Sequence, residues 1–179
     1  ANGGNGGNGG DGGFGGGGGA GGFGGNGGFG STESNNDKQI EGDSGSPGKG
    51  GFGGGNGQLG AGGGGGGFGG AVFVRSGSLV LNQVRFERNR AIAGAGLSPG
   101  QGKGGAIFVT PTALQTGQNL KIASVLALGD LPIFIDNTAS EGLNLSSDNN
   151  NIYSDSSSKV AVHAVSPRAV QRTPNQWSR

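Results

Sequence analysis

Apolar and polar residues alternate along much of the second half of the chain. The alternating apolar residues are Val72, Val74, Leu79, Leu81, Val84 and Phe86, and a two-residue period is typical of half-buried β-strands. Two short motifs also recur: GGAVFV at residues 69–74 returns as GGAIFV at 104–109, and FERNRA at 86–91 returns as FIDNTA at 134–139. The segments between the strands are too short for crossover helices. Residues 69–165 are therefore predicted to be all-β, as a short β-solenoid in which each coil stacks on the next.

Two later segments extend this pattern. DNNNIYS at residues 148–154 is predicted to form a further corner and strand, and KVAVHAV at 159–165, with Val160 and Val162, a last strand. Such a strand can close its own last coil or pair with the edge of a neighbouring molecule, and the sequence leaves both open. Residues 166–179 form a C-terminal tail in which Trp177 suits either a docking segment or a solvated terminus.

The first part of the chain has a period of three instead of two. Gly3 to Gly30 reads Gly-Gly-X, and 48 of the 179 residues are glycine. In a polyproline II conformation, with three residues per turn, every X side chain lies on one edge and the other two edges are bare. Bare edges let neighbouring backbones approach and hydrogen-bond. We therefore predict a polyglycine II-like bundle, although a flexible linker is the alternative for such a composition.

The predicted bundle has aromatic and polar positions on its X edge. Five phenylalanines are expected to anchor it in a core or interface: Phe14, Phe23, Phe29, Phe52 and Phe68. The polar X residues Asn2, Asn5, Asn8 and Asp11 are expected to face solvent. A polar loop is predicted at residues 31–48, after which a second set of extended strands pairs with the first. The predicted domains are thus residues 1–68, 69–165 and the tail 166–179.

Composition narrows the possible partners. The net charge is +1 with scattered basic residues, so bulk attraction to nucleic acid is not indicated. The chain has no cysteine, which excludes a disulfide scaffold and a thiolate metal site. No apolar run approaches the roughly 20 residues that span a bilayer. Because the sequence starts at Ala1 inside a repeat, we expect it to be a processed piece of a longer precursor.

The recurring motifs carry a family resemblance. GGA followed by Ile or Val and Phe, with F-x-x-N-x-A further on, resembles the repeats of chlamydial polymorphic outer-membrane proteins and of large repetitive surface proteins of cyanobacteria and other bacteria. The resemblance covers about residues 69–153 and implies a right-handed parallel β-helix on an exported passenger domain. It also implies that Asn89 and Asn137 sit at coil corners, where an asparagine tolerates a left-handed conformation and bonds neighbouring backbone. The insertion IAGAGLSPGQGK at 92–103 departs from the pattern.

The glycine-rich half has a resemblance of its own. By composition and period alone, it is similar to the polyglycine II bundles of certain antifreeze proteins and phage tail adhesins.

Residues that carry catalysis or bind cofactors are hard to find in this chain. His163 is the only histidine, and the carboxylates after residue 69 are spread out without pairing. The segment GGNGGDGGF matches part of a calcium-binding nonapeptide, but Gly13 stands where a large apolar residue is required. Calcium near Asp37, Glu41 and Asp43 is a lesser alternative to a solvated charged loop. We expect no enzymatic activity, no cofactor and no metal.

These features predict an extracellular structural protein that self-associates into a surface fibre, filament or sheath, because both halves expose repetitive backbone edges. The alternative is an adhesin passenger domain that binds glycan or a host surface, for which Tyr153 and Trp177 are the non-Phe aromatic candidates. Ice binding by a flat glycine face is a third hypothesis, but a row of Thr or Ala would be expected there.

Overall fold

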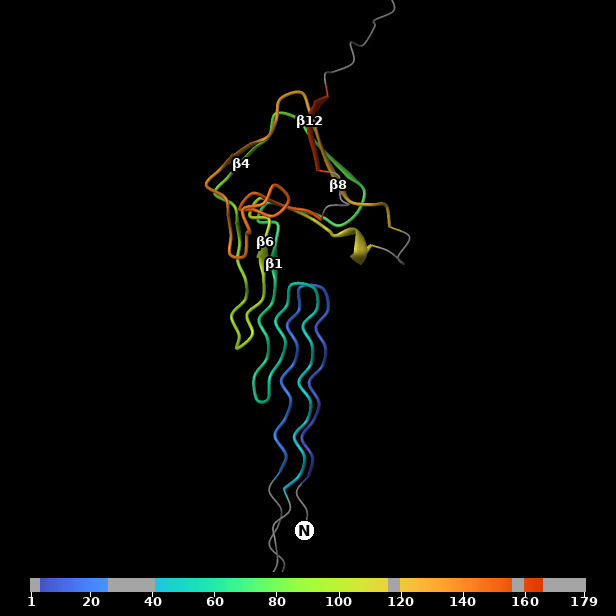
Figure 1. Ribbon diagram of the computed structural model, residues 1–179, viewed down its shortest axis with the longest axis vertical. Coiled ribbons are helices and arrows are strands. Elements are labelled where there is room, and N and C mark those ends of the chain that lie inside the picture. The colour runs from blue at the N-terminus through green and yellow to red at the C-terminus, as the bar shows by residue number, and fades with distance from the viewer. Residues whose placement is uncertain (1–3, 26–40, 116–119, 156–159, 166–179) are drawn as a thin grey trace, which may run out of the picture.

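The chain folds into short parallel strands at one end and long extended runs at the other. The computed structural model describes residues 4–25, 41–115, 120–155 and, for the backbone alone, 160–165. Within these residues the structure is all-β, with one 3-10 turn, η1 (Thr112–Leu114). Figure 1 shows the strands together at one end, while the glycine-rich runs lie side by side and extend away from them. The prediction of an all-β protein is confirmed.

The strands fall into three successive repeats. The first contains β1 (Gly67–Phe68), β2 (Val72–Val74), β3 (Ser78–Leu81), β4 (Arg85–Glu87) and β5 (Arg90–Ala91). The second contains β6 (Gly102–Lys103), β7 (Ile107–Val109), β8 (Ser124–Leu128), β9 (Ile133–Ile135) and β10 (Thr138–Ala139). The third contains β11 (Ile152–Tyr153) and β12 (Val160–Val165).

Each strand pairs in parallel with its counterpart in the next repeat. The sheets are β1-β6, β2-β7-β11, β3-β8-β12, β4-β9 and β5-β10. Their register follows the sequence motifs, because Phe73 lies opposite Phe108 and Phe86 lies opposite Phe134. The last strand, β12, pairs with β8 of the same chain, with Val160 opposite Val125. Its backbone therefore closes its own sheet, whereas the side chains of β12 lie outside the described residues.

The core lies between the sheets of the repeats. Alternation along each strand sends every second side chain inward, so Ile107 and Val109 belong to the core and are fully buried. The other buried core residues are Val74, Leu81, Phe86, Ala106, Ala123 and Val125. Burying one large apolar side chain stabilises the fold by about 1.5–3 kcal/mol. Phe108, between Ile107 and Val109, points to the opposite face.

An asparagine ladder crosses the repeats at one corner. The Asn137 side chain is 4% exposed, and its Nδ2 donates to the Phe86 carbonyl and to Oδ1 of Asn151, both at 3.1 Å. Its Oδ1 accepts from the backbone N–H of Asn89 at 3.0 Å and from Nδ2 of Asn89 at 2.9 Å. Asn137 thus joins all three repeats and gives the part-buried backbone N–H of Asn89 an acceptor.

The left-handed residues at this corner are the neighbours of the asparagines. Asparagine tolerates a left-handed conformation, but the positive φ values belong to the preceding residues, Arg88 (55°) and Asp136 (50°). Because the asparagine side chain must turn inward to reach the next repeat, the tight turn falls on the exposed residue before it. The expectation that these asparagines bond neighbouring backbone agrees with the contacts of Asn137.

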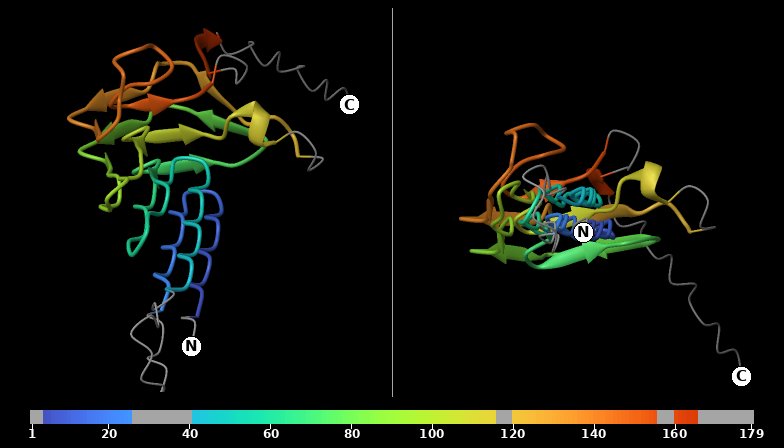
Figure 2. Two further views of the ribbon diagram at one scale, coloured as in Figure 1. Left: turned by 60° about the horizontal axis from the view of Figure 1, so that its bottom comes forward. Right: turned by 90° about the horizontal axis from the view of Figure 1, so that it is seen from below.

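The glycine-rich part consists of extended runs that lie side by side. We name them run A (residues 4–13), run B (16–25), run C (42–51), run D (54–58) and run E (61–66). Tight turns at Phe14–Gly15 and Phe52–Gly53 connect A to B and C to D, with positive φ at Gly15 (72°) and Gly53 (70°). Figure 2 shows these runs as a bundle beside the strands.

Hydrogen bonds join the runs at every third residue. Run B donates to run A through four amides at N···O distances of 2.7–2.8 Å: Gly16 to Gly13, Gly19 to Gly10, Gly22 to Gly7 and Gly25 to Gly4. Run A donates to run C in the same rhythm: Gly6 to Asp43, Gly9 to Ser46 and Gly12 to Lys49. Run B also bonds to runs C, D and E, so it is the central run.

Run C corrects one expectation. The predicted polar loop extends to residue 48, but residues 42–48 already belong to this run, because Gly42, Gly45 and Gly48 donate their amides to run B. Its other residues, such as Ser44 and Pro47, are exposed. Only the residue that faces the neighbouring backbone must be glycine, so the run tolerates polar residues on its other edges. Residues 31–40 lie outside the described part.

The polar X residues of run A also have a bonding role. Asn5, Asn8 and Asp11 are exposed, as expected, but each side chain accepts a backbone amide from run C. The donors are the N–H groups of Asp43 at 2.9 Å, Ser46 at 2.8 Å and Lys49 at 2.6 Å. These side-chain oxygens satisfy amides for which the adjacent run offers no carbonyl.

The insertion that departs from the repeats extends the bundle. Residues 92–101 turn down beside run E, as Figure 1 shows. The bonds that join them are Gly94 N–H to Gly65 O at 2.7 Å, Gly64 N–H to Ser98 O at 2.9 Å and Gly67 N–H to Gln101 O at 2.9 Å. The insertion thus ties the first and second repeats to the runs.

The ladder leads to a testable expectation. Replacing Asn137 with Ala removes the side-chain acceptor of the Asn89 amide and a donor to the Phe86 carbonyl, and a buried polar group left without its partner costs about 1–3 kcal/mol. Asn137→Ala should therefore lower the free energy of unfolding by at least that amount, as measured by denaturant titration. The control is Asn82→Ala, because Asn82 is exposed and should change stability little. Equal stability of the two variants would contradict a structural role for the ladder.

Candidate functional site

The bundle and the strands meet at a cluster of aromatic rings. We call it the aromatic junction and define it by six residues: Phe14, Phe52, Phe68, Phe73, Phe108 and Tyr153. Three of these rings come from the sheet β2-β7-β11, and three come from the glycine-rich part or its end. The junction joins the two halves of the described chain through side-chain contacts.

The sheet contributes a column of stacked rings. Phe73, Phe108 and Tyr153 occupy the same register position in β2, β7 and β11, because these strands pair in parallel without offset. Their ring centroids are 5.2 Å and 5.0 Å apart, with interplanar angles of 7° and 8°. Phe108 is fully buried although it points away from the core. The bundle therefore covers a face of the sheet that would otherwise meet solvent.

The bundle contributes a second stack from its two tight turns. Phe14 and Phe52 occupy equivalent turn positions, and their rings lie 5.4 Å apart at 15°. Because this spacing is close to that of the column in the sheet, each turn ring contacts two neighbouring sheet rings. Phe14 lies 5.6 Å from Phe73 and 6.1 Å from Phe108, with edge-to-face geometry. Phe52 lies 6.1 Å from Phe108 and 6.3 Å from Tyr153.

Phe68 completes the junction from the end of β1. Its ring centroid is 4.7 Å from that of Phe108 and 5.2 Å from that of Phe14. Offset and edge-to-face aromatic pairs contribute about 0.5–1.5 kcal/mol beyond the burial of their area. Since the rings come from both halves, these contacts fix the bundle against the sheet.

The structure brings together only some of the residues singled out in the sequence. Phe14, Phe52 and Phe68 meet in the junction, whereas Phe23 is 67% exposed and lies against Gly60 at the far turn of the bundle. Phe29 and Trp177 lie outside the described residues. Val160 and Val162 are described only as backbone of β12. Asn89 and Asn137 belong to the ladder and do not touch the junction rings.

Three junction residues were missed in the sequence. Phe73, Phe108 and Tyr153 stand between inward-facing residues, so their alternation assigns them to the outer face. The available signal was the alignment of the repeated motifs, which places an aromatic ring at the same position in three repeats. A column of outward-facing rings predicts that something covers it.

A buried ion pair lies beside the junction. Lys103 Nζ is 2.8 Å from Asp148 Oδ2, and their side chains are only 9% and 8% exposed. The same ammonium donates to the Glu141 carbonyl at 2.6 Å and lies 5.7 Å from the centre of the Tyr153 ring. The pair links β6 to the segment before β11. Each charge needs the other, because a buried charge without a partner would be costly.

Burial and two nearby carboxylates favour the neutral form of the Tyr153 phenol. Burial of its phenol raises its pKa above the ordinary value, and the negative charges of Asp148 and Asp155 raise it further. Because the folded state holds this proton more tightly than the unfolded state, the stabilisation is present at neutral pH and is lost as the pH rises above the ordinary pKa of tyrosine. The ring therefore enters the stack as an uncharged group.

The described residues hold no group of three or more His, Asp or Glu side chains that could bind a metal ion. Among the same residues, no helix has the length and apolar character needed to cross a bilayer. Comparison with known proteins gives no further guide, since no family model, curated protein or solved structure matches this chain. What the arrangement does physically is hold two repetitive backbone arrays in a fixed relation.

The junction predicts a large difference between two phenylalanines. Phe108→Ala removes the ring that contacts five others, and truncating a buried Phe typically costs about 3–5 kcal/mol. Phe23→Ala removes an exposed ring that stacks on no other described ring, so the change should stay within about 0.5 kcal/mol. Thermal unfolding of both variants measures the difference, and similar losses would argue against the junction.

Proposed function

We propose that this protein is an extracellular structural protein whose copies self-associate into a surface fibre, filament or sheath. The bundle is the part that would carry this association. The observation that supports it most is a row of glycines on the outer edge of run A that packing among the described residues does not require.

The row consists of Gly4, Gly7, Gly10 and Gly13. A Cβ atom added at any of these positions would meet no atom of the described residues within 4 Å. The next row of the same run, Gly6, Gly9 and Gly12, is different, because a Cβ there would overlap a carbonyl oxygen of run B. Ordering a glycine costs more conformational entropy than ordering any other residue. Glycines that face open space are therefore explained best if a neighbour outside the chain packs against them.

The hydrogen bonds of the same edge are incomplete. Run B, for comparison, donates amides on two of its edges. Gly16, Gly19, Gly22 and Gly25 donate to run A, and Gly18 and Gly21 donate to run D. In run A, only the row of Gly6, Gly9 and Gly12 donates. The amides of Gly7, Gly10 and Gly13 have no acceptor among the described residues. Run A thus has both the space and the donors for one more extended run, and a second copy of this chain offers such runs.

The proposal includes the finer description of both halves. We propose that the runs are polyglycine II helices, since they bond at every third residue and need glycine on the edges that touch. We propose that the strand repeats form a right-handed parallel β-helix, supported by the parallel pairing of successive repeats. The resemblance of the GGA and F-x-x-N motifs to bacterial surface proteins supports an exported location.

The proposal predicts opposite effects for two adjacent glycines. Gly10→Ala adds a methyl group into open space, so the fold should keep its melting temperature while association between copies weakens. Gly9→Ala forces a Cβ against the Gly19 carbonyl, and overpacking of this kind costs about 1–3 kcal/mol, so the melting temperature should fall. Light scattering over a range of concentrations measures association, and circular dichroism measures unfolding.

Two results would contradict the proposal. One is a wild-type protein that remains a monodisperse monomer at high concentration. The other is a Gly10→Ala variant that associates as strongly as wild type, which would place the contact elsewhere.

A further inference from the structure

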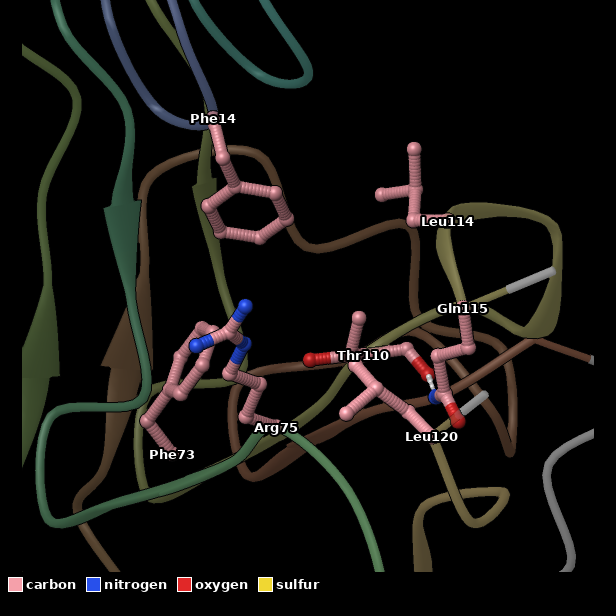
Figure 3. Close-up of a pocket in the computed structure, with 7 residues that line it drawn as sticks. All are labelled: Phe14, Phe73, Arg75, Thr110, Leu114, Gln115 and Leu120. Atoms are coloured by element: carbon pink, nitrogen blue, oxygen red, sulfur yellow. Dashed lines mark hydrogen bonds between the residues drawn. The ribbon is translucent and has the colours of Figure 1, made fainter. Parts of the chain in front are cut away.

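A cavity of about 300 Å³ opens beside the aromatic junction, between the first turn of the bundle and the ends of β2 and β7. Its walls are apolar and come from distant parts of the chain: Phe14 from the bundle, Phe73 from β2, Leu114 from η1, and Leu120. Figure 3 shows Phe14 on one side of this space and Phe73 with Arg75 on another. The volume lies at the lower end of the range for small-molecule pockets.

Two polar groups stand together at one side of the cavity. Arg75 directly follows β2, and Thr110 directly follows β7, next to it in the parallel pair; the Thr110 amide donates to the Val74 carbonyl at 3.0 Å. Arg75 makes no ion pair with any described carboxylate. Thr110 is 5% exposed, and its hydroxyl has no hydrogen-bond partner within the part of the chain that the structure describes. In Figure 3 that hydroxyl points to the side on which Arg75 lies.

The remaining polar side chain of the lining is already satisfied. Gln115 donates from Nε2 to the Thr110 carbonyl at 2.6 Å and accepts the Ala123 amide on Oε1 at 2.9 Å. A ligand therefore meets apolar walls and one unpaired guanidinium, and a buried hydroxyl without a hydrogen-bond partner among the described residues lies beside them. A guanidinium binds a carboxylate through charge-assisted hydrogen bonds, and a buried hydroxyl without a partner gains by donating to the same group.

We propose that this cavity binds a small carboxylic acid with an aromatic or branched aliphatic body. The carboxylate lies against Arg75 and Thr110, and the body fills the space between Phe14, Phe73 and Leu114. A sugar fits less well, because its many hydroxyls would find only these two free polar partners. The site is separate from the glycine row of run A, so it does not depend on the proposed self-association.

Calorimetry and ligand-observed NMR with phenylacetate test this proposal. Phenylacetate should bind saturably, whereas 2-phenylethanol, which has the ring without the charge, and glucuronate, which has the charge without the apolar body, should not. Arg75→Gln should raise the dissociation constant roughly tenfold or more, since a charge-assisted contact is lost. The matched control Arg90→Gln changes an exposed arginine of β5 outside the cavity and should leave binding unchanged.

A second variant tests the apolar part of the site. Leu114→Trp fills the cavity from the η1 side and should abolish binding, with circular dichroism to show that the fold persists. The proposal is overturned if wild type binds no phenylacetate, if 2-phenylethanol binds as well as phenylacetate, or if Arg75→Gln and Arg90→Gln bind alike. Should Leu114→Trp fail to fold, the Arg75 pair of variants still decides the outcome.

Discussion

The structure depends on backbones that touch without side chains between them. At Gly18, Gly45 and Gly51, a Cβ atom would overlap a carbonyl oxygen of the adjacent run, so no other residue fits these positions. Ordering glycine is entropically expensive, at roughly 1–2 kcal/mol per residue for the backbone. The hydrogen bond that recurs at every third residue offsets this cost, and the central run B gains most because it has neighbours on several sides.

A common spacing lets the two halves fit together. Rings in the sheet repeat every 5.0–5.2 Å, and the two turn rings of the bundle lie 5.4 Å apart. Neighbouring strands in a sheet lie about 4.7–4.9 Å apart, so one repeat of the sheet corresponds to one hairpin of the bundle. Each turn ring can then sit between two sheet rings. The same match lets residues 92–101 leave the first repeat, lie along run E and return to the second.

Parts of this architecture were predictable from the sequence. The repeated GGA and F-x-x-N motifs give the strand register, because identical segments stacked in parallel place like residues opposite each other. The period of three predicts that X side chains share an edge. The first part of run C, residues 42–48, was assigned to a polar loop because glycine occurs there only at every third position. The junction was missed because alternation alone assigns Phe108 to solvent, and only the bundle's position shows that this ring is covered.

Residue-specific amide hydrogen exchange in dilute solution tests the central claim most directly. If closely packed glycine backbones hold the bundle together, the amides of Gly9, Gly12 and Gly18, which donate to neighbouring runs, should exchange far more slowly than those of an unstructured peptide. The amides of Gly7 and Gly10, which have no acceptor among the described residues, should exchange fast in the same molecule. Uniform exchange of all five at the rate of an unfolded chain would contradict the account.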